Sequence, residues 1–191
     1  PAYKKYRPGI GRITATIPGF FENGSIYSYS VAMKILADCV HNRADRAIES
    51  FIKISPLNPN ISAKETGLEP YSFTNFFIGP ENKTRFGQAP YSWFSGTVAW
   101  QHMLLYNWIV GFRPEYEGIL IQPCLPSDWE NVEMTRTLRN ATYSIKIQNE
   151  SKGKNIISSI KIDGKPFLNN LLPYFDDGKN HSVDILLTEH N

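Results

Sequence analysis

Apolar side chains in the amino-terminal half of the chain recur with the period of an α-helix. From Ser28 to about Arg43 they cover most of the circumference, which predicts a helix that packs on more than one side. A second helix is predicted up to Pro56, with one narrow apolar stripe at Ala44, Ala47, Ile48, Phe51 and Ile52. A third runs from about Gly96 to Val110 and is again apolar nearly all round. Two of the three helices therefore need partners on most sides.

Beyond Gly111 the apolar period changes to two, which predicts strands. The alternating positions are Ile119 and Ile121, Val132 and Met134, Tyr143, Ile145 and Ile147, Ile160 and Ile162, and Val183, Ile185 and Leu187. Asp163-Gly164 between two such runs is a strong hairpin signal, and the segment 151–154 is a looser one. The carboxy-terminal half is therefore predicted to be an antiparallel β-sandwich.

Helices followed by strands, without βαβ alternation, indicate an α+β protein with segregated layers. The change of period places the division near residue 115, so residues 1–115 and 116–191 are predicted to be two domains. The helical part carries more apolar surface than a free-standing bundle can cover. Its partner is expected to be another chain, a homo-oligomer or the rest of a larger helical barrel, and the start at Pro1 suggests a piece of something longer.

The composition is that of a folded protein without a strongly charged surface. With 191 residues, 41% of them hydrophobic, the chain can bury a core as one domain or two small ones. Its 20 basic and 18 acidic residues leave a charge of +2, which argues against nucleic-acid or membrane partners. Neither a membrane span nor a secretory signal is evident, so a cytoplasmic location is predicted. Cys39 and Cys124 lack metal or redox spacing and are expected to be free buried thiols.

The tripeptide Ser95-Gly96-Thr97 directly precedes an apolar helical run. Ser or Thr at this place caps a helix, and Gly96 would let a ligand approach the unpaired amides of the first turn. A phosphate there would gain from those donors and from the positive end of the helix dipole. The alternative is that Ser95 only caps its own helix.

Two carboxylates lie at breaks in the apolar pattern. Glu22 precedes the turn-forming pair Asn23-Gly24, which would hold its carboxylate at the mouth of the first helix. It could accept hydrogen bonds from sugar hydroxyls or simply be a solvated acid at a helix start. Glu69-Pro70-Tyr71 is a second polar break, which suits either an inward ligand contact or a turn.

Aromatic residues and histidines give weaker evidence for a functional site than the motifs above. Trp93 and Trp100 flank the Ser-Gly-Thr motif, and sugar sites offer an aromatic face, but core packing would explain both residues equally well. The four histidines are scattered, with no spacing typical of metal ligands, so we predict no metal site.

Several motifs, in this order, resemble a known family over about residues 10–190. They are Glu22–Tyr29 (ENGSIYSY), Glu69–Tyr71 (EPY), Ser92–Trp100 (SWFSGTVAW), Ile109–Gly118 (IVGFRPEYEG), Gln122–Trp129 (QPCLPSDW) and Thr135–Tyr143 (TRTLRNATY). The sequence is similar to the carboxy-terminal third of the cellobiose and chitobiose phosphorylases of glycoside hydrolase family 94.

The resemblance implies the end of an (α/α)6 barrel followed by a β-sandwich. It further implies inverting phosphorolysis of a β-linked disaccharide or oligosaccharide, giving a sugar 1-phosphate and a shortened acceptor. Glu22 would then bind the acceptor sugar, with Glu69 and Tyr71 as further substrate contacts, and Ser95-Gly96 would cradle phosphate. Inorganic phosphate is the implied co-substrate, and no cofactor is expected.

Two departures and two alternatives accompany the resemblance. Tyr29 stands where the family commonly has a phosphate-binding His, and Ser95 replaces the usual Thr. The family's general-acid Asp and phosphate-binding Arg residues are expected upstream, so the chain alone is predicted to be inactive. The alternatives are an inverting hydrolase with Glu22 and Glu69 about 6.5 to 9.5 Å apart, and a non-catalytic sugar-binding or structural module.

Overall fold

The computed structural model describes residues 2–93 and 96–190. The chain divides into two compact units: unit 1 comprises Pro1–Ile35 and Glu49–His102, and unit 2 comprises Leu36–Ile48 and Met103–Asn191. The mixed helix and sheet content agrees with the predicted α+β class. The barrel portion and the domain division at residue 115 stay predictions. None of the described helices is both long and apolar enough to pass through a lipid bilayer.

The first two predicted helices are confirmed. α1 spans Ser28–Val40 and α2 spans Ala44–Ile54, which ends two residues before Pro56. One face of α2 is buried, as its stripe predicts, through Ala44, Ala47 and Phe51. Met33 and Val40 of α1 are exposed, so part of the apolar surface for which the sequence predicts a partner is uncovered in this chain.

Three short elements of unit 1 were not anticipated from the sequence. They are a 3-10 turn η1 (Arg12–Ala15), the helix α3 (Ala63–Thr66) and a two-stranded pairing of β1 (Ile26–Tyr27) with β2 (Phe76–Phe77). Ser62 caps α3 by accepting the backbone N–H of Glu65 at 3.1 Å, and Gly67 ends it in the left-handed region. Each of these elements is too short to produce a hydrophobic periodicity in the sequence.

The third predicted helix is present, but its hydrogen bonding changes from α-helical to π-helical along its length. α4 is regular over Thr97–Met103 and continues as a π-helical segment η2 over Leu104–Ile109, where the Val110 N–H bonds to the Leu105 carbonyl at 2.9 Å. Within unit 2, the side chains of η2 are held by cation-π contacts. The Arg113 guanidinium lies 3.9 Å from the Trp108 ring and that of Arg136 lies 5.1 Å from the Tyr106 ring.

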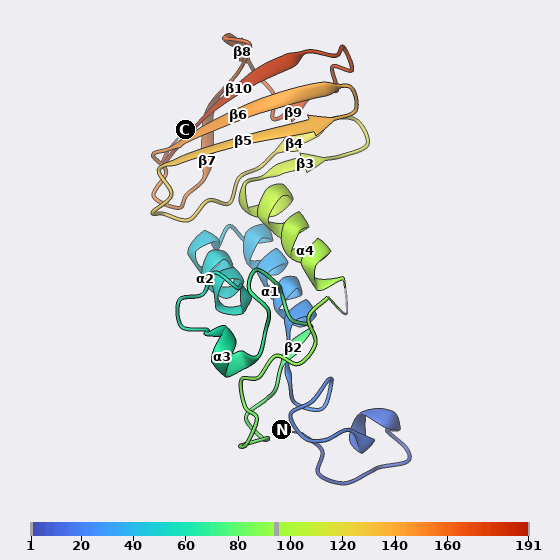
Figure 1. Cartoon of the computed structure of the whole chain (residues 1–191). Helices are drawn as coiled ribbons and strands as arrows, with labels where there is room; N and C mark the ends of the chain where they lie inside the picture. The colour runs from blue at the N-terminus through green and yellow to red at the C-terminus, as the bar shows by residue number, and fades with distance from the viewer. Residues whose placement is uncertain (1, 94–95, 191) are drawn as a thin grey trace. The chain divides into compact units, whose positions relative to one another are not determined.

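Unit 2 contains two sheets that enclose one core (Figure 1). The larger has the order β5-β6-β10-β7-β8, with strands Asn131–Leu138, Ala141–Asn149, Asn180–Thr188, Ile156–Ile162 and Lys165–Phe167. The smaller has the order β3-β4-β9, with strands Phe112–Pro114, Ile119–Ile121 and Leu171–Leu172. Side chains from both sheets join in one cluster, for example Phe112 against Tyr143 with ring centroids 5.6 Å apart. A sandwich is thus confirmed.

The prediction of a fully antiparallel sandwich is wrong. β10 runs parallel to β6, with Val183 beside Ile145, and antiparallel to β7 on its other edge. The Asp163-Gly164 hairpin is confirmed, since β7 and β8 pair around it with both turn residues at positive φ. The segment 151–154, by contrast, is a turn but not a hairpin, because β10 lies between β6 and β7. Alternation along a strand fixes the buried face but carries no information on its direction.

The two cysteines are free and buried, as expected. Cys39 at the end of α1 and Cys124 after β4 both belong to unit 2, and their thiols are hydrogen-bonded to each other. This hydrogen bond, together with burial, raises the pKa of the Cys39 thiol. The same hydrogen bond lowers the pKa of the Cys124 thiol.

Candidate functional site

The extended segment Thr74–Ile78 is the centre of unit 1, and all of it is buried. On one edge it pairs with β1, and the Asn75 carbonyl accepts the Ser28 N–H at 2.9 Å. On the other edge, the Asn75 N–H donates to the Tyr91 carbonyl at 2.7 Å and Thr74 forms a backbone bridge with Ser92. This one segment therefore brings together two stretches of sequence that carry candidate residues, through Ile26–Ser28 on one side and Tyr91 and Ser92 on the other.

The turn that carries Glu22 is rigid. The buried Asn23 side chain accepts the Tyr3 N–H at 2.7 Å and donates to the Thr16 carbonyl at 2.8 Å. Gly79 packs so closely that a Cβ on it would lie 1.8 Å from the Gly24 carbonyl oxygen. The amide of Asn23 is thus fully used by the fold, whereas the side chain of Glu22 is exposed. The turn fixes the backbone and leaves the carboxylate available.

Aromatic side chains of this turn pack against Phe76 and Tyr91. Phe21 packs against Phe76 with ring centroids 4.9 Å apart and against Tyr91 at 5.4 Å, and Phe20 meets Phe76 edge-on at 6.0 Å. Phe21 has a positive φ of 45°, a conformation that bulky residues rarely adopt and that surrounding contacts must maintain. The packing explains how Phe21 keeps this conformation beside Glu22.

Glu69 and Tyr71 lie in the loop between α3 and β2. A hydrogen bond from the Ser92 side chain lowers the pKa of the Glu69 carboxyl, so Glu69 is ionised at neutral pH. This bond also joins the loop of Glu69 to the segment that leads to Gly96. Tyr71 is 87% exposed and, like Trp93, has a positive φ.

The predicted phosphate-binding residues are only partly described. Ser95 lies outside the described residues. Gly96 is exposed, and the nearest described atom that a Cβ on it would meet is Trp100 Cδ1 at 3.8 Å, an ordinary contact. Tyr29, in the first turn of α1, meets the Trp100 ring edge-on at 5.2 Å. The Trp100 N–H bonds to the Gly96 carbonyl, so the residue that Tyr29 contacts lies one helical turn after Gly96.

A hollow of about 810 Å³ in unit 1 does not include these residues. It is lined mainly by apolar side chains of α1, α2 and the loop around α3, with Phe77 and Phe86, and with Lys34 and Lys53 as its basic members. Glu22, Tyr29, Glu69, Tyr71 and Gly96 are not among its lining residues. Glu22, Glu69, Tyr71 and Gly96 are exposed, whereas Tyr29 is partly buried in the first turn of α1.

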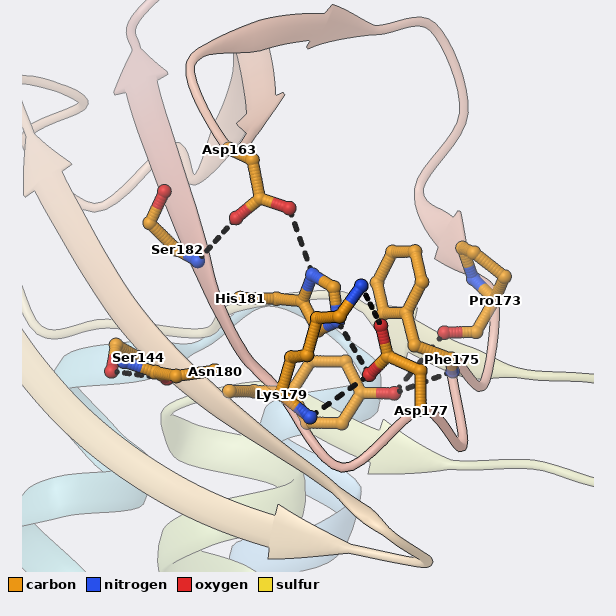
Figure 2. A network of polar contacts seen from close by, with 10 residues as sticks. Ser144, Asp163, Pro173, Phe175, Asp177, Lys179, Asn180, His181 and Ser182 are labelled. Carbon is orange, nitrogen blue, oxygen red and sulfur yellow. Dashed lines mark hydrogen bonds and ion pairs between the residues drawn. The ribbon is translucent and has the colours of Figure 1, made fainter.

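A second polar cluster, which the sequence did not reveal, lies in unit 2 (Figure 2). The imidazole of His181 is held between two carboxylates, with Nδ1 2.8 Å from Asp163 Oδ2 and Nε2 3.1 Å from Asp177 Oδ1. The ring of Phe175 stacks on it at 3.8 Å, and Asp163 also accepts the Ser182 N–H at 2.9 Å. The spacing of Asp177 and His181, four residues apart, was the only local signal.

The His181 cluster has the properties of a structural contact. Hydrogen bonds to Asp163 and then to Asp177 raise the pKa of His181, and the same bonds lower the pKa of both carboxyls. Each ring nitrogen lies within hydrogen-bond distance of a carboxylate and one ring face is covered by Phe175, so neither nitrogen points to an open position where a substrate could bind. The ion triad ties the β7–β8 turn to the start of β10.

Comparison with known families gives a match over residues 1–111 to the glycosyl hydrolase 94 superfamily, catalytic domain. The chain belongs to this superfamily. The matched region contains all six residues that the sequence proposed for substrate or phosphate, from Glu22 to Gly96. In this family 94 chain, the β-sandwich lies almost entirely outside the matched residues.

Curated relatives support the assignment over nearly the whole chain. Solabiose phosphorylase of Paenibacillus borealis is 37% identical over 97% of this chain and 24% of its own length. An N,N'-diacetylchitobiose phosphorylase of Vibrio proteolyticus is 31% identical over 97% of this chain and 23% of its own. A 3-O-beta-D-glucopyranosyl-beta-D-glucuronide phosphorylase of Paenibacillus borealis is 29% identical over 99% and 24%. The family 94 chain thus spans about a quarter of the length of these relatives.

Among solved structures, similarity is low. A family GH92 alpha-mannosidase of Bacteroides thetaiotaomicron aligns with a TM-score of 0.38 and 11% identity, over 94% of this chain and 19% of that one.

Proposed function

We propose that this chain is a carboxy-terminal portion of an inverting glycoside phosphorylase and carries part of its acceptor-sugar and phosphate site. The observation that supports this most is that the segment Thr74–Ile78 pairs with two of the motifs, through Ile26–Ser28 and Ser92, while Ser92 in turn bonds to Glu69 of a third. Relatives that match the chain over nearly its whole length are named phosphorylases of β-linked and other disaccharides. The proposed substrates are a β-linked disaccharide or oligosaccharide and inorganic phosphate, with no further cofactor.

In the proposed reaction, a phosphate oxygen attacks the anomeric carbon from the face opposite the glycosidic oxygen. The bond from that carbon to the glycosidic oxygen breaks with its electron pair, and a general acid gives this oxygen a proton. The products are a sugar 1-phosphate of inverted configuration and the shortened acceptor. We propose that the acid is an Asp supplied by a segment outside these residues.

Each described residue has a proposed part in binding. The exposed carboxylate of Glu22, on its rigid turn, accepts hydroxyl donors of the acceptor sugar. The open surroundings of Gly96 admit phosphate to the backbone at the start of α4, and Ser95 would donate its hydroxyl there. Tyr29, a neutral donor near Trp100, replaces the charge that a His would bring.

The lowered pKa of Glu69 disfavours this residue as the general acid of a hydrolase. A glycosidase needs one carboxyl that stays protonated near neutral pH, with its pKa raised by its surroundings. The hydrogen bond from Ser92 has the opposite effect on Glu69. An ionised Glu69 suits sugar binding better than proton donation.

The test compares this chain with the protein encoded by its complete reading frame. Each is incubated with cellobiose, laminaribiose or chitobiose, with and without phosphate, and sugar 1-phosphate and free sugar are measured. We expect the complete protein to form an α-configured sugar 1-phosphate only with phosphate, and the 191-residue chain to form none. Turnover by the isolated chain would contradict the proposed origin of the acid. Release of free sugar without phosphate would establish the hydrolase instead.

We also propose that the protein is cytoplasmic. Its expected partners are the remainder of the enzyme or a second copy, which would cover the exposed apolar residues of α1.

A further inference from the structure

Two large aromatic residues in unit 1 combine a rare backbone conformation with solvent exposure. Tyr71 has a φ of 64° and is 87% exposed, and Trp93 has a φ of 60° and is 72% exposed. A bulky residue in the left-handed region costs on the order of 1–3 kcal/mol. An exposed large ring also lacks the stabilisation that burial of its apolar surface would give. Within the part of the chain that the structure describes, neither ring is buried in the core, so binding of a ligand would account for both.

The two rings extend from segments that are fastened to each other. The Ser92 side chain hydrogen-bonds to the carboxylate of Glu69, two residues before Tyr71. Ser92 also forms a backbone bridge with Thr74, and the Thr74 hydroxyl donates to the Tyr91 carbonyl at 3.2 Å. Trp93 and Tyr71 therefore belong to one rigid surface rather than to independent loops.

The chemistry of this surface matches a pyranose. The C–H face of a sugar ring packs on an aromatic ring, while its hydroxyls donate to a carboxylate, which Glu69 supplies. The second tryptophan of the motif, Trp100, is different, because it packs edge-on against Tyr29 and is only partly exposed. The structure thus separates the two tryptophans that the sequence left equivalent.

We infer that Trp93 and Tyr71 form an aromatic platform that binds a pyranose ring of the saccharide, with Glu69 accepting its hydroxyl protons. The inference rests on the proposed function, since it assumes a saccharide substrate. It adds a preference: the negative charge of Glu69 selects neutral sugars over uronic acids, because a sugar carboxylate there meets like charge. One of the relatives is named for a glucuronide, so the charge at this platform would distinguish members of the family.

The experiment is calorimetric titration of the 191-residue chain with cellobiose and with the matched disaccharide that carries a glucuronic acid. The variants are Trp93→Gly and Tyr71→Gly, which remove the rings and relieve the positive φ. Tyr116→Gly, at a 96% exposed ring in unit 2, is the control. We expect the first two to weaken cellobiose binding about tenfold each, with melting temperatures equal to or above that of the parent. The control should bind as the parent does.

The second expectation concerns charge. The uronic disaccharide should bind about tenfold more weakly than cellobiose, and Glu69→Gln should remove most of this difference. Unchanged cellobiose affinity in both glycine variants would overturn the platform. If both glycine variants bound cellobiose as the parent does but Glu22→Gln bound it more weakly, the proposed function would stand without the aromatic platform. No saccharide binding at all, with no sugar 1-phosphate from the complete reading frame, would overturn both.

Discussion

The region around Glu22 in unit 1 and the His181 cluster in unit 2 are built from the same residue types but use them differently. Around His181, two carboxylates, an imidazole and an aromatic ring contact one another beside the β7–β8 turn. In unit 1, the backbone at Glu22 is held as firmly, but its carboxylate is exposed, and so are the rings of Tyr71 and Trp93 elsewhere in this unit. Polar groups that are already paired stabilise a fold, whereas unpaired groups on a rigid support are available to a ligand.

The largest expected effect is a difference in stability between alanine substitutions at two glycines of unit 1. Gly79→Ala places a Cβ 1.8 Å from the Gly24 carbonyl oxygen, so the backbone must move, and we expect a loss of about 3–5 kcal/mol. Gly96→Ala meets only Trp100 Cδ1 at 3.8 Å and should leave the melting temperature almost unchanged. Thermal melts followed by circular dichroism check this difference.

Phosphate titration then sharpens the glycine comparison. Gly96→Ala should weaken phosphate binding severalfold while the protein remains folded, because the new methyl group blocks the approach to the backbone. A variant that binds phosphate as well as the parent would remove Gly96 from the site.

His181→Phe should destabilise unit 2 by a smaller amount. The substitution keeps a ring against Phe175 but leaves the carboxylates of Asp163 and Asp177 without their partner. We expect the melting temperature to fall by about 2–4 °C, a typical response for a protein of this size. Saccharide binding should be unaffected, and a change in it would contradict the structural role of the cluster.

The same cluster predicts a dependence of stability on pH. The pKa of His181 is raised above its ordinary value of 6.5, so its contribution is complete below about 6.5 and is lost as pH rises through the folded pKa. The pKa values of Asp163 and Asp177 are lowered below 3.8, so their contribution holds above 3.8 and is lost at more acid pH. The melting temperature of the parent should therefore fall relative to that of His181→Phe as pH rises above about 6.5. Parallel curves for both proteins would refute this.

A still smaller effect is expected at Tyr29. Tyr29→His would restore a group that can carry positive charge near the start of α4, so phosphate should bind about fivefold more tightly at pH 6 than to the parent. The gain should shrink at pH 8, where the imidazole is neutral. Tyr116→His, far along the chain in unit 2, is the control and should change phosphate affinity at neither pH.

The sequence predicted those parts of the fold that have a local period. The stripe from Ala44 to Ile52 and the alternation from Tyr143 to Ile147 correspond to α2 and β6. It could not predict that β10 joins β6 in parallel, because direction depends on the path of the chain through β8 and β9. The pairing of β1 with β2 was equally hidden, because each strand has two residues and their partners are about fifty positions apart.

The candidate site divides in the same way. Glu22 and Gly96 could be named from turn and helix-start chemistry, but the pairing of Thr74–Ile78 with Ser28 and with Ser92 joins residues far apart in the sequence and has no local signal. The positive φ of Tyr71 and Trp93 has no sequence signal, because Gly or Asn would ordinarily mark such positions. His181 was missed because Asp163 reaches it only through the folded hairpin.

The most direct test of the claim that the exposed groups of unit 1 bind a ligand is a calorimetric titration of the parent and Glu22→Gln with cellobiose, with and without phosphate. We expect the parent to bind more tightly in the presence of phosphate, and Glu22→Gln to bind about tenfold more weakly with an unchanged melting temperature. Equal affinity of the two proteins, or binding that ignores phosphate, would contradict the account.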